Sequence, residues 1–409
     1  QVVSKGGFDR LTTYGIEEFT TEDDQSPTDR RAPRIATNTF GDDVRASLTH
    51  SALAKTSSLA AFAPHGGKGG ATGISDAGHG LSECSDESSA HISSPKVESL
   101  RSPRYNLPDI RRDSRTLFSK KDHTVLVLDW DDTIFPTTFV RKDCGLDWRR
   151  SIAEQVLPGP GRTELEALFV RLTACMESFI TAACSTASVC IVTLAKHPWV
   201  LTSCDNFLPA FRPLMEKFNI KIIYARDCMT DDMRREYGAN TFKTSDQEAD
   251  FWMRAKQTAM TREIGEIHAS RGSSWKNIIS IGDSDFERVA LLATAESHVR
   301  AASSTGQVAQ SGLTSEFVTK DGHVQRLRAK TVKMLEDPSL EELIAQQTLL
   351  TSWLPFLINR DTGLDITFHN SEDDNQLNDL NRFVTGEDAD LSWLTLAGVD
   401  PEKSDLDQE

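Results

Sequence analysis

The sequence predicts a doubly wound α/β fold, in which helices cover both faces of a parallel sheet in three α/β/α layers. The first observation is a set of four short apolar runs, at 124–128, 187–192, 220–225 and 277–281. These runs are continuously apolar rather than alternating, which is typical of strands buried on both faces of a parallel sheet. The second observation is that helical patterns separate the runs, and repeated strand–helix–strand units give right-handed crossovers.

Helical segments are predicted between and after these strands. A helix over 163–184 starts with a capping box at Thr163–Glu166 and carries apolar residues at helical spacing. A second helix is expected over 205–218. A later helix is predicted to begin with Asp337 as its N-cap and Pro338 in its first position, because proline is favoured there.

Composition limits the class of protein. The 409 residues carry 61 acidic and 45 basic side chains, a formal net charge of −16. This acidic balance opposes nucleic-acid backbones, so we expect no nucleic-acid partner. No unbroken apolar run approaches the ~20 residues that a membrane span needs, so we expect no membrane partner. The seven cysteines form no CxxC pair, which favours a reducing intracellular compartment, the cytoplasm or the nucleus.

The apolar residues are concentrated in the middle of the chain. Residues 1–119 are rich in serine and glycine and bury too little surface to offset an ordering entropy of ~1 to 2 kcal/mol per residue, so we predict a disordered N-terminal region. Residues 120–360 are expected to form the globular domain. Residues 361–409 are acidic and are predicted to be a mostly disordered tail. Within it, 391–399 is apolar enough to dock on the domain or on a partner.

The chain begins at Gln1 without an initiator methionine. We therefore expect the natural N-terminus to lie further upstream. Targeting signals cannot be read from this end of the sequence.

Polar side chains follow three of the predicted strands. Asp129 and Asp131 follow the first apolar run, and their spacing of two lets both carboxylates face one side. Thr193 ends the second run and Asp283 follows the fourth. In such a sheet, ligands bind beyond the carboxyl ends of the strands. Carboxylates held close together repel one another and favour a divalent cation, so the sequence predicts a cation site for phosphate chemistry.

The order DxDxT, a strand-ending Thr, a Lys and then GDxxx(D/E) resembles the four motifs of the haloacid dehalogenase (HAD) superfamily, in its phosphatase and phosphotransferase branches. The resemblance covers roughly residues 123–354 and implies a Rossmann-like, HAD-like fold with Mg²⁺ as cofactor. It implies that Asp129 is the nucleophile that becomes an aspartyl phosphate, and that Asp131 is the general acid and base. Thr193 would hold a phosphoryl oxygen. Mg²⁺ would be bound by Asp129, the main-chain carbonyl of Asp131, and Asp283.

Two lysines precede the last motif, and we predict that Lys256 is the catalytic one. Lys276 directly precedes the fourth run, so at ~3.3 Å per residue it would lie about 20 Å from the carboxyl end of that strand. Lys256 lies in a helical pattern and can point its amine at the site, where it would screen the phosphoryl charge.

The residues after Asp283 are expected to surround the metal ligands. These are Ser284, Asp285 and Glu287. Glu287 stands where the superfamily more usually has aspartate, one methylene shorter. Metal ligation through water and a salt bridge with Lys256 both remain open for it.

The spacing between the motifs leaves room for a flap at 134–160 but not for a folded cap domain. We therefore expect little or no cap and an open site, which favours a phosphorylated substrate such as a phosphoprotein or another large phosphoester, without excluding a small molecule. The predicted function is a Mg²⁺-dependent phosphomonoester hydrolase. The alternatives are a phosphotransferase or mutase of the same superfamily and a non-catalytic HAD-like binding scaffold. The sequence does not fix the oligomeric state.

Overall fold

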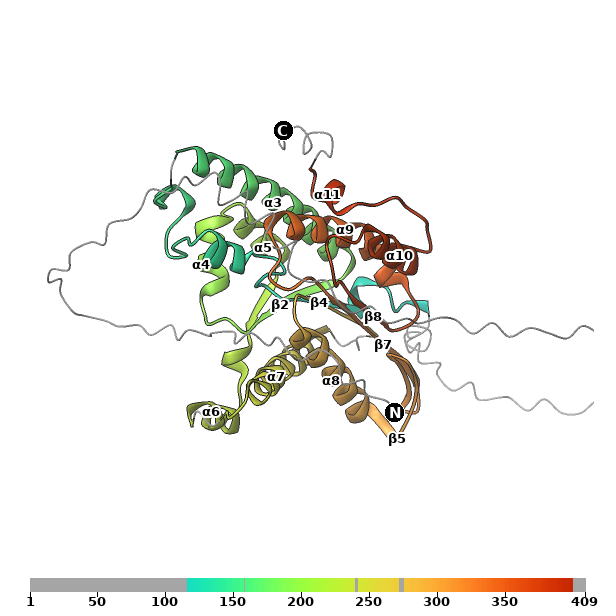
Figure 1. Ribbon diagram of the computed structural model, residues 1–409. Helices are drawn as coiled ribbons and strands as arrows, with labels where there is room; N and C mark the ends of the chain where they lie inside the picture. Colours follow the sequence, from blue (N-terminus) through green and yellow to red (C-terminus); the bar gives the residue numbers. More distant parts are fainter. Residues whose placement is uncertain (1–115, 158, 240–241, 272–275, 400–409) are drawn as a thin grey trace, which may run out of the picture. The chain divides into compact units, whose positions relative to one another are not determined.

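The computed structural model describes residues 116–157, 159–239, 242–271 and 276–399 (Figure 1). The predicted disordered N-terminal region lies almost entirely outside these residues. The last ten residues of the predicted acidic tail lie outside them as well.

An eight-stranded sheet forms the centre of the described part of the chain. Its strand order is β3-β2-β1-β4-β7-β6-β5, and β8 pairs with β7. The strands β1, β2, β3, β4, β7 and β8 pair in parallel, whereas β5 and β6 form antiparallel pairs. The predicted α/β class is therefore confirmed, but the sheet is mixed and mostly parallel. The strands are β1 (Thr124–Leu128), β2 (Ser188–Thr193), β3 (Lys221–Tyr224), β4 (Asn277–Gly282), β5 (Ser303–Ser311), β6 (Thr314–Thr319), β7 (Val324–Lys333) and β8 (Leu364–Thr367).

Helices cover both faces of this sheet. In Figure 1, α7 and α8 lie below the strands, and α3, α5, α9 and α10 lie above them. The α-helices are α3 (Gly159–Thr186), α4 (Trp199–Phe207), α5 (Phe211–Phe218), α6 (Asp231–Gly238), α7 (Ser245–Arg271), α8 (Asp285–Ala302), α9 (Leu340–Asn359), α10 (Asp374–Thr385) and α11 (Trp393–Leu396).

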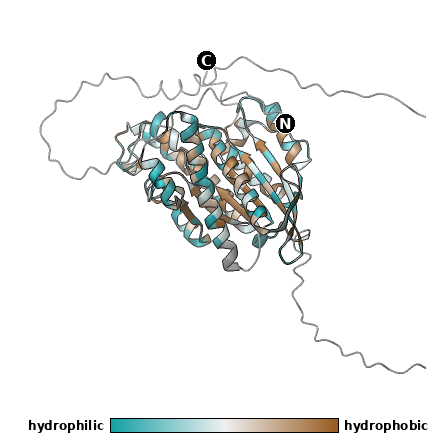
Figure 2. Ribbon diagram, turned by 90° about the horizontal axis from the view of Figure 1, so that it is seen from below, coloured by the Kyte–Doolittle hydropathy of each residue, from teal (hydrophilic) through white to brown (hydrophobic). Residues whose placement is uncertain are grey.

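Each face of the sheet has its own apolar core. Leu126 and Leu128 of β1 belong to the core that includes α3, α4 and α9, whereas Val125 and Val127 belong to the core that includes α7 and α8. Successive residues of a strand point to opposite faces, so a strand covered on both sides has to be apolar throughout. Figure 2 shows the central strands largely in the hydrophobic colour, with hydrophilic stretches on the helices.

Three predicted helix boundaries are wrong. α3 begins at Gly159 rather than at Thr163, whose hydroxyl donates to the carbonyl of Gly159 (3.2 Å) from inside the helix. Ser339, not Asp337, is the N-cap of α9, because its side chain accepts a backbone N–H of the first turn. The helix predicted over 205–218 is two helices, since α4 ends at residue 207 and α5 begins at 211.

The predicted domain boundary at residue 360 is also wrong, because residues 361–399 contain strand and helices of the same domain. β8 extends the sheet beside β7, and Leu377, Val384 and Trp393 are buried in the core on the α9 side. Segment 391–399 thus docks on the domain, which was one of its two expected roles. The acidic composition of this segment concealed these few apolar residues, and one of its carboxylates, Asp365, pairs with Arg288 (2.5 Å).

By length and composition alone, α3 is apolar enough to cross a membrane. Its apolar residues at helical spacing, among them Phe169, Leu172 and Met176, are buried in the same core as those of α9. Core helices of globular proteins pass the same test, so we interpret α3 as a core helix. The absence of a membrane partner stays a prediction.

Candidate active site

The adjacent ends of β1 and β4 bring three carboxylates together. Asp129 follows β1 and Asp283 follows β4, and these strands are hydrogen-bonded neighbours. Glu287, in the first turn of α8, folds back over Gly282, where a Cβ atom would lie 2.3 Å from its Cγ; only glycine leaves room for it. One oxygen from each of Asp129, Asp283 and Glu287 lies within 4.8 Å of the others, and all three residues are buried.

Lys256 of α7 supplies a positive charge to this group. Its Nζ donates to Asp129 Oδ1 (2.7 Å) and to Glu287 Oε1, and the residue is 1% exposed. Burial alone would lower the pKa of Lys256, but attraction to Asp129 and Glu287 outweighs burial and raises the pKa above its usual value. Lys276 lies elsewhere, since its main-chain N–H donates to the main-chain carbonyl of His123 just before β1 (3.0 Å). A catalytic role for Lys256 stays a prediction.

The balance of charge in this cluster favours a bound cation. Burial, as the largest cause, raises the pKa of Asp129 and of Asp283 well above the usual range, and neighbouring carboxylates raise both further. When all three carboxylates are ionised, three negative charges face the single ammonium of Lys256. Carboxylate oxygens are the ligands that hard divalent cations prefer. The residues present therefore fit a metal ion, and Asp129, Asp283 and Glu287 could hold one.

Asp131 lies next to this cluster, but its side chain has different partners. Oδ1 accepts hydrogen bonds from Thr137 Oγ1 (2.6 Å) and Trp199 Nε1 (2.7 Å), and Oδ2 accepts one from Thr193 Oγ1 (3.0 Å). The Asp131 carboxylate is therefore not one of the three clustered groups. The predicted metal contact was the main-chain carbonyl of Asp131, and it stays a prediction.

Two threonines connect the predicted motifs. Thr193 is fully buried at the end of β2, and its hydroxyl accepts the N–H of Ala195 (2.9 Å) while it donates to Asp131. Thr193 and Asp131 thus meet at one edge of the sheet, as the sequence predicted. Thr133, the last residue of the DxDxT motif, had no assigned role, and its hydroxyl lies 3.5 Å from Asp283 Oδ1.

The residues after Asp283 divide into two kinds. Ser284 is the N-cap of α8, and Glu287 Oε2 accepts from its N–H (3.1 Å) and its hydroxyl (2.6 Å) in a capping box. Glu287 thus uses one oxygen for the helix start and the other for Lys256, which is the salt bridge that the sequence left open. Asp285 has a side chain that is 60% exposed and lies 3.6 Å from Arg288, so it does not join the cluster.

Sequence reasoning missed Asp132 and Trp199. Asp132 is buried, has a left-handed backbone (φ 52°), and accepts from the N–H (2.8 Å) and hydroxyl (2.7 Å) of Thr138. Burial is the largest cause that raises its pKa, to about 7. The only sequence signal for Asp132 was its place in the acidic run, and for Trp199 its place shortly after the second strand.

The predicted flap is packed into the domain. Ile134, Phe135 and Val140 are fully buried, and the Trp148 ring meets the Trp199 ring edge-on (5.5 Å between centroids). Apolar residues in this segment therefore join the core instead of leaving a loose loop. Asp131 is partly exposed, whereas the three clustered carboxylates are buried. The open site stays a prediction.

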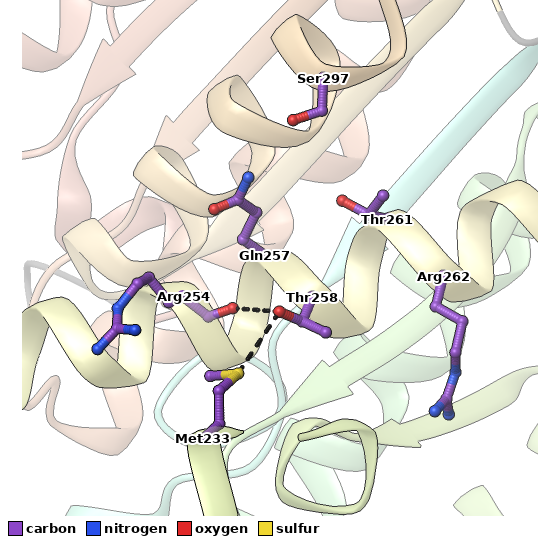
Figure 3. A pocket seen from close by; sticks show the side chains of 7 residues that line it. All are labelled: Met233, Arg254, Gln257, Thr258, Thr261, Arg262 and Ser297. Atoms are coloured by element: carbon purple, nitrogen blue, oxygen red, sulfur yellow. Dashed lines mark hydrogen bonds between the residues drawn. The ribbon is translucent and has the colours of Figure 1, made fainter. Parts of the chain in front are cut away.

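A separate hollow of about 520 Å³ lies along α7 (Figure 3). At about 100° per residue, Arg254 and Thr258 lie on nearly the opposite side of the helix from Lys256. Arg254 pairs with Glu236 (2.7 Å). This hollow is therefore not part of the carboxylate cluster. It is lined by Met233, Arg254, Gln257, Thr258, Thr261, Arg262 and Ser297.

No family model, curated protein or solved structure matches this chain. The fold and the site define an α/β protein with a mostly parallel sheet and a buried group of carboxylates that could bind a metal ion.

Proposed function

We propose that this protein is a Mg²⁺-dependent phosphomonoester hydrolase that acts through an aspartyl phosphate. The observation that carries the proposal is the contact of buried Lys256 with both Asp129 and Glu287, beside Asp283. A candidate nucleophile, its counter-ion and oxygen ligands for a cation therefore share one cluster. The resemblance of the motif order to HAD phosphatases supports the same chemistry, and we extend the proposal to membership of that superfamily.

The residues of this cluster have complementary tasks in such a reaction. Asp129 offers a carboxylate oxygen to phosphorus, and Lys256 offsets the negative charge that the phosphoryl group adds. Asp131 protonates the leaving oxygen and then accepts a proton from the hydrolytic water, and the hydroxyl of Thr193 binds a phosphoryl oxygen. Asp129 and Asp283 would hold Mg²⁺, whose chemical contribution is to neutralise charge on the phosphoryl oxygens.

Hydrolysis of p-nitrophenyl phosphate by the full chain tests this function. We expect turnover in Mg²⁺, and a loss of about 10³-fold or more with EDTA or with Asp129→Asn, because nucleophile and charge neutralisation are then removed. Asp321→Asn makes the same chemical change at an exposed turn and should leave the rate within about twofold.

The same experiment separates the alternatives. If phosphate passes to an added alcohol rather than to water, the protein is a phosphotransferase. If no phosphoester is turned over and calorimetry detects no Mg²⁺ binding, the hydrolase proposal is wrong and a non-catalytic scaffold is favoured. For the substrate we propose a phosphoprotein or another large phosphoester, from the short spacing between the motifs.

A further inference from the structure

We propose that Trp199 and Thr137 anchor one oxygen of Asp131, so that the other oxygen alone exchanges the proton during catalysis. This inference rests on the proposed function, because it assigns positioning residues to the general acid and base. Neither residue belongs to the motifs on which the function was proposed. Both were brought to Asp131 by the fold.

The two oxygens of Asp131 are held very differently. Oδ1 accepts two short hydrogen bonds, from Thr137 Oγ1 (2.6 Å) and Trp199 Nε1 (2.7 Å), and these donors come from separate segments. Two donors fill the two lone-pair directions of a carboxylate oxygen. Oδ2 has a single, longer hydrogen bond from Thr193 Oγ1 (3.0 Å). Oδ1 is therefore the fixed oxygen and Oδ2 the one that can change partner.

Trp199 is itself held rigidly at the start of α4. The residue is 6% exposed, and its ring lies edge-on to Phe135 (5.7 Å) and Trp148 (5.5 Å). Trp130, between the two acids, donates from Nε1 to Ser203 Oγ (3.0 Å), and Ser203 donates to the carbonyl of Trp199 (2.9 Å). The loop that carries Asp131 and the helix that carries its donor are thus connected twice, which fixes the carboxylate relative to the site.

The hydroxyl of Thr193 has only one hydrogen to donate. In the structure it donates to Asp131 Oδ2, and it accepts the N–H of Ala195 (2.9 Å). A phosphoryl oxygen bound by Thr193 would take that hydrogen, because the lone pair facing Ala195 is already in use. Substrate binding would therefore release Oδ2 while Trp199 and Thr137 still hold Oδ1.

The proton balance of the reaction follows from this arrangement. In the first step Asp129 forms a bond to phosphorus, the bond from phosphorus to the leaving oxygen breaks, and Oδ2–H of Asp131 gives its proton to that oxygen. In the second step water attacks phosphorus, the Asp129–phosphorus bond breaks, and Oδ2 takes a proton from the water.

A comparison of leaving groups tests the inference. An alkoxide needs a proton to leave, whereas p-nitrophenolate leaves without one, so damage to the acid affects alkyl phosphates more. Trp199→Phe keeps an aromatic ring but removes the N–H donor. We expect it to lower kcat/KM, which reports the leaving-group step alone, about 10- to 100-fold more for glycerol 2-phosphate than for p-nitrophenyl phosphate. Asp131→Asn should show the same selectivity with a larger loss.

Trp353→Phe is the matched control, because it also removes a buried indole donor, to Asn381 Oδ1 (2.9 Å), at a position on α9. Its ratio of alkyl to aryl rates should equal that of the wild type. Thr137→Val carries the test if Trp199→Phe does not fold. If Asp131→Asn is selective and both positioning variants keep the wild-type ratio, the inference is wrong. If the wild type hydrolyses neither ester, the proposed function itself has failed.

Discussion

The two buried lysines Lys256 and Lys330 have pKa values that are shifted in opposite directions. Lys256 is 1% exposed and Lys330 is 0% exposed. Lys256 contacts Asp129 and Glu287, and its pKa is raised. Lys330, on β7, donates to the main-chain carbonyl of Leu357 (2.5 Å), and burial, the largest cause, lowers its pKa to about 7. Burial by itself favours the neutral form, and only contact with negative groups keeps a buried ammonium charged.

The regions around these two lysines also differ in their balance of positive and negative side chains. Near Lys330, Arg328 pairs with Asp361 and its guanidinium lies 3.9 Å from the centre of the Phe118 ring. In this region Arg328 thus has its partners, a carboxylate and an aromatic ring, within the protein. Phe118 thereby packs against residues of the domain. Around Lys256 the carboxylates outnumber the cation, so a bound metal ion would complete this region.

Replacing each lysine by methionine should give the largest contrast. Lys256→Met leaves buried carboxylates without their counter-ion, and we expect the free energy of unfolding to fall by about 3 to 5 kcal/mol. Lys330→Met removes a buried amine that donates to a main-chain carbonyl rather than to a carboxylate, and should change the free energy of unfolding by less than about 1 kcal/mol. Urea unfolding at pH 7, without divalent cations, measures both. If both variants lose the same free energy of unfolding, the contacts of Lys256 with Asp129 and Glu287 do not contribute the expected stability.

Divalent cations should stabilise the region around Lys256. A cation at 100 times its Kd adds about 2.7 kcal/mol when it binds only the folded state. We expect Mg²⁺ to raise Tm in the wild type and in Lys330→Met, and to have little effect in Asp283→Asn, which lacks a ligand. Thermal unfolding in MgCl₂ is compared with KCl at the same ionic strength, because KCl reproduces screening alone. If Mg²⁺ raises the Tm of Asp283→Asn as much as that of the wild type, the ion binds at another place.

Lys330 should give the protein a pH-dependent stability. Its pKa is about 7 in the folded state, below its value of about 10.4 in the unfolded chain, so between these values the unfolded chain binds more protons. Stability from this group therefore rises with pH from about 7 to about 10, by up to about 1.4 kcal/mol per pH unit. Lys330→Met should flatten the curve of unfolding free energy against pH over that range. An unchanged slope would mean that Lys330 stays charged in the fold.

The strands of the site could be predicted because their environment imposes one simple pattern. β1, β2 and β4 are largely buried between two helical layers, so their sequences are mostly apolar, and β3, at the end of the strand order, keeps this pattern after its exposed first residue, Lys221. β7 escaped prediction because it buries Arg328 and Lys330, whose polar side chains interrupt such a run. β5 is almost wholly exposed, so its composition carries no burial signal.

The residues of the site that directly follow a predicted strand could be predicted as well as the strands themselves. Asp129, Thr193 and Asp283 follow predicted strands, and their arrival at one edge depends only on strand order and direction. Asp285 was expected near the metal ligands and lies in solvent instead, because the capping box of α8 turns Glu287 inward and leaves Asp285 on the outer side.

The sequence by itself determined the α/β class, four of the parallel strands and the positions from which carboxylates reach the edge of the sheet, since hydrophobic burial leaves a local and periodic record in the chain. Only the tertiary structure decided which charges meet. Glu287 pairs with Lys256, 31 residues away, and Trp199 donates to Asp131 across 68 residues. Charge pairing and hydrogen bonding depend on distances of a few ångströms between such remote segments, and those distances exist only once the sheet and its helices have packed.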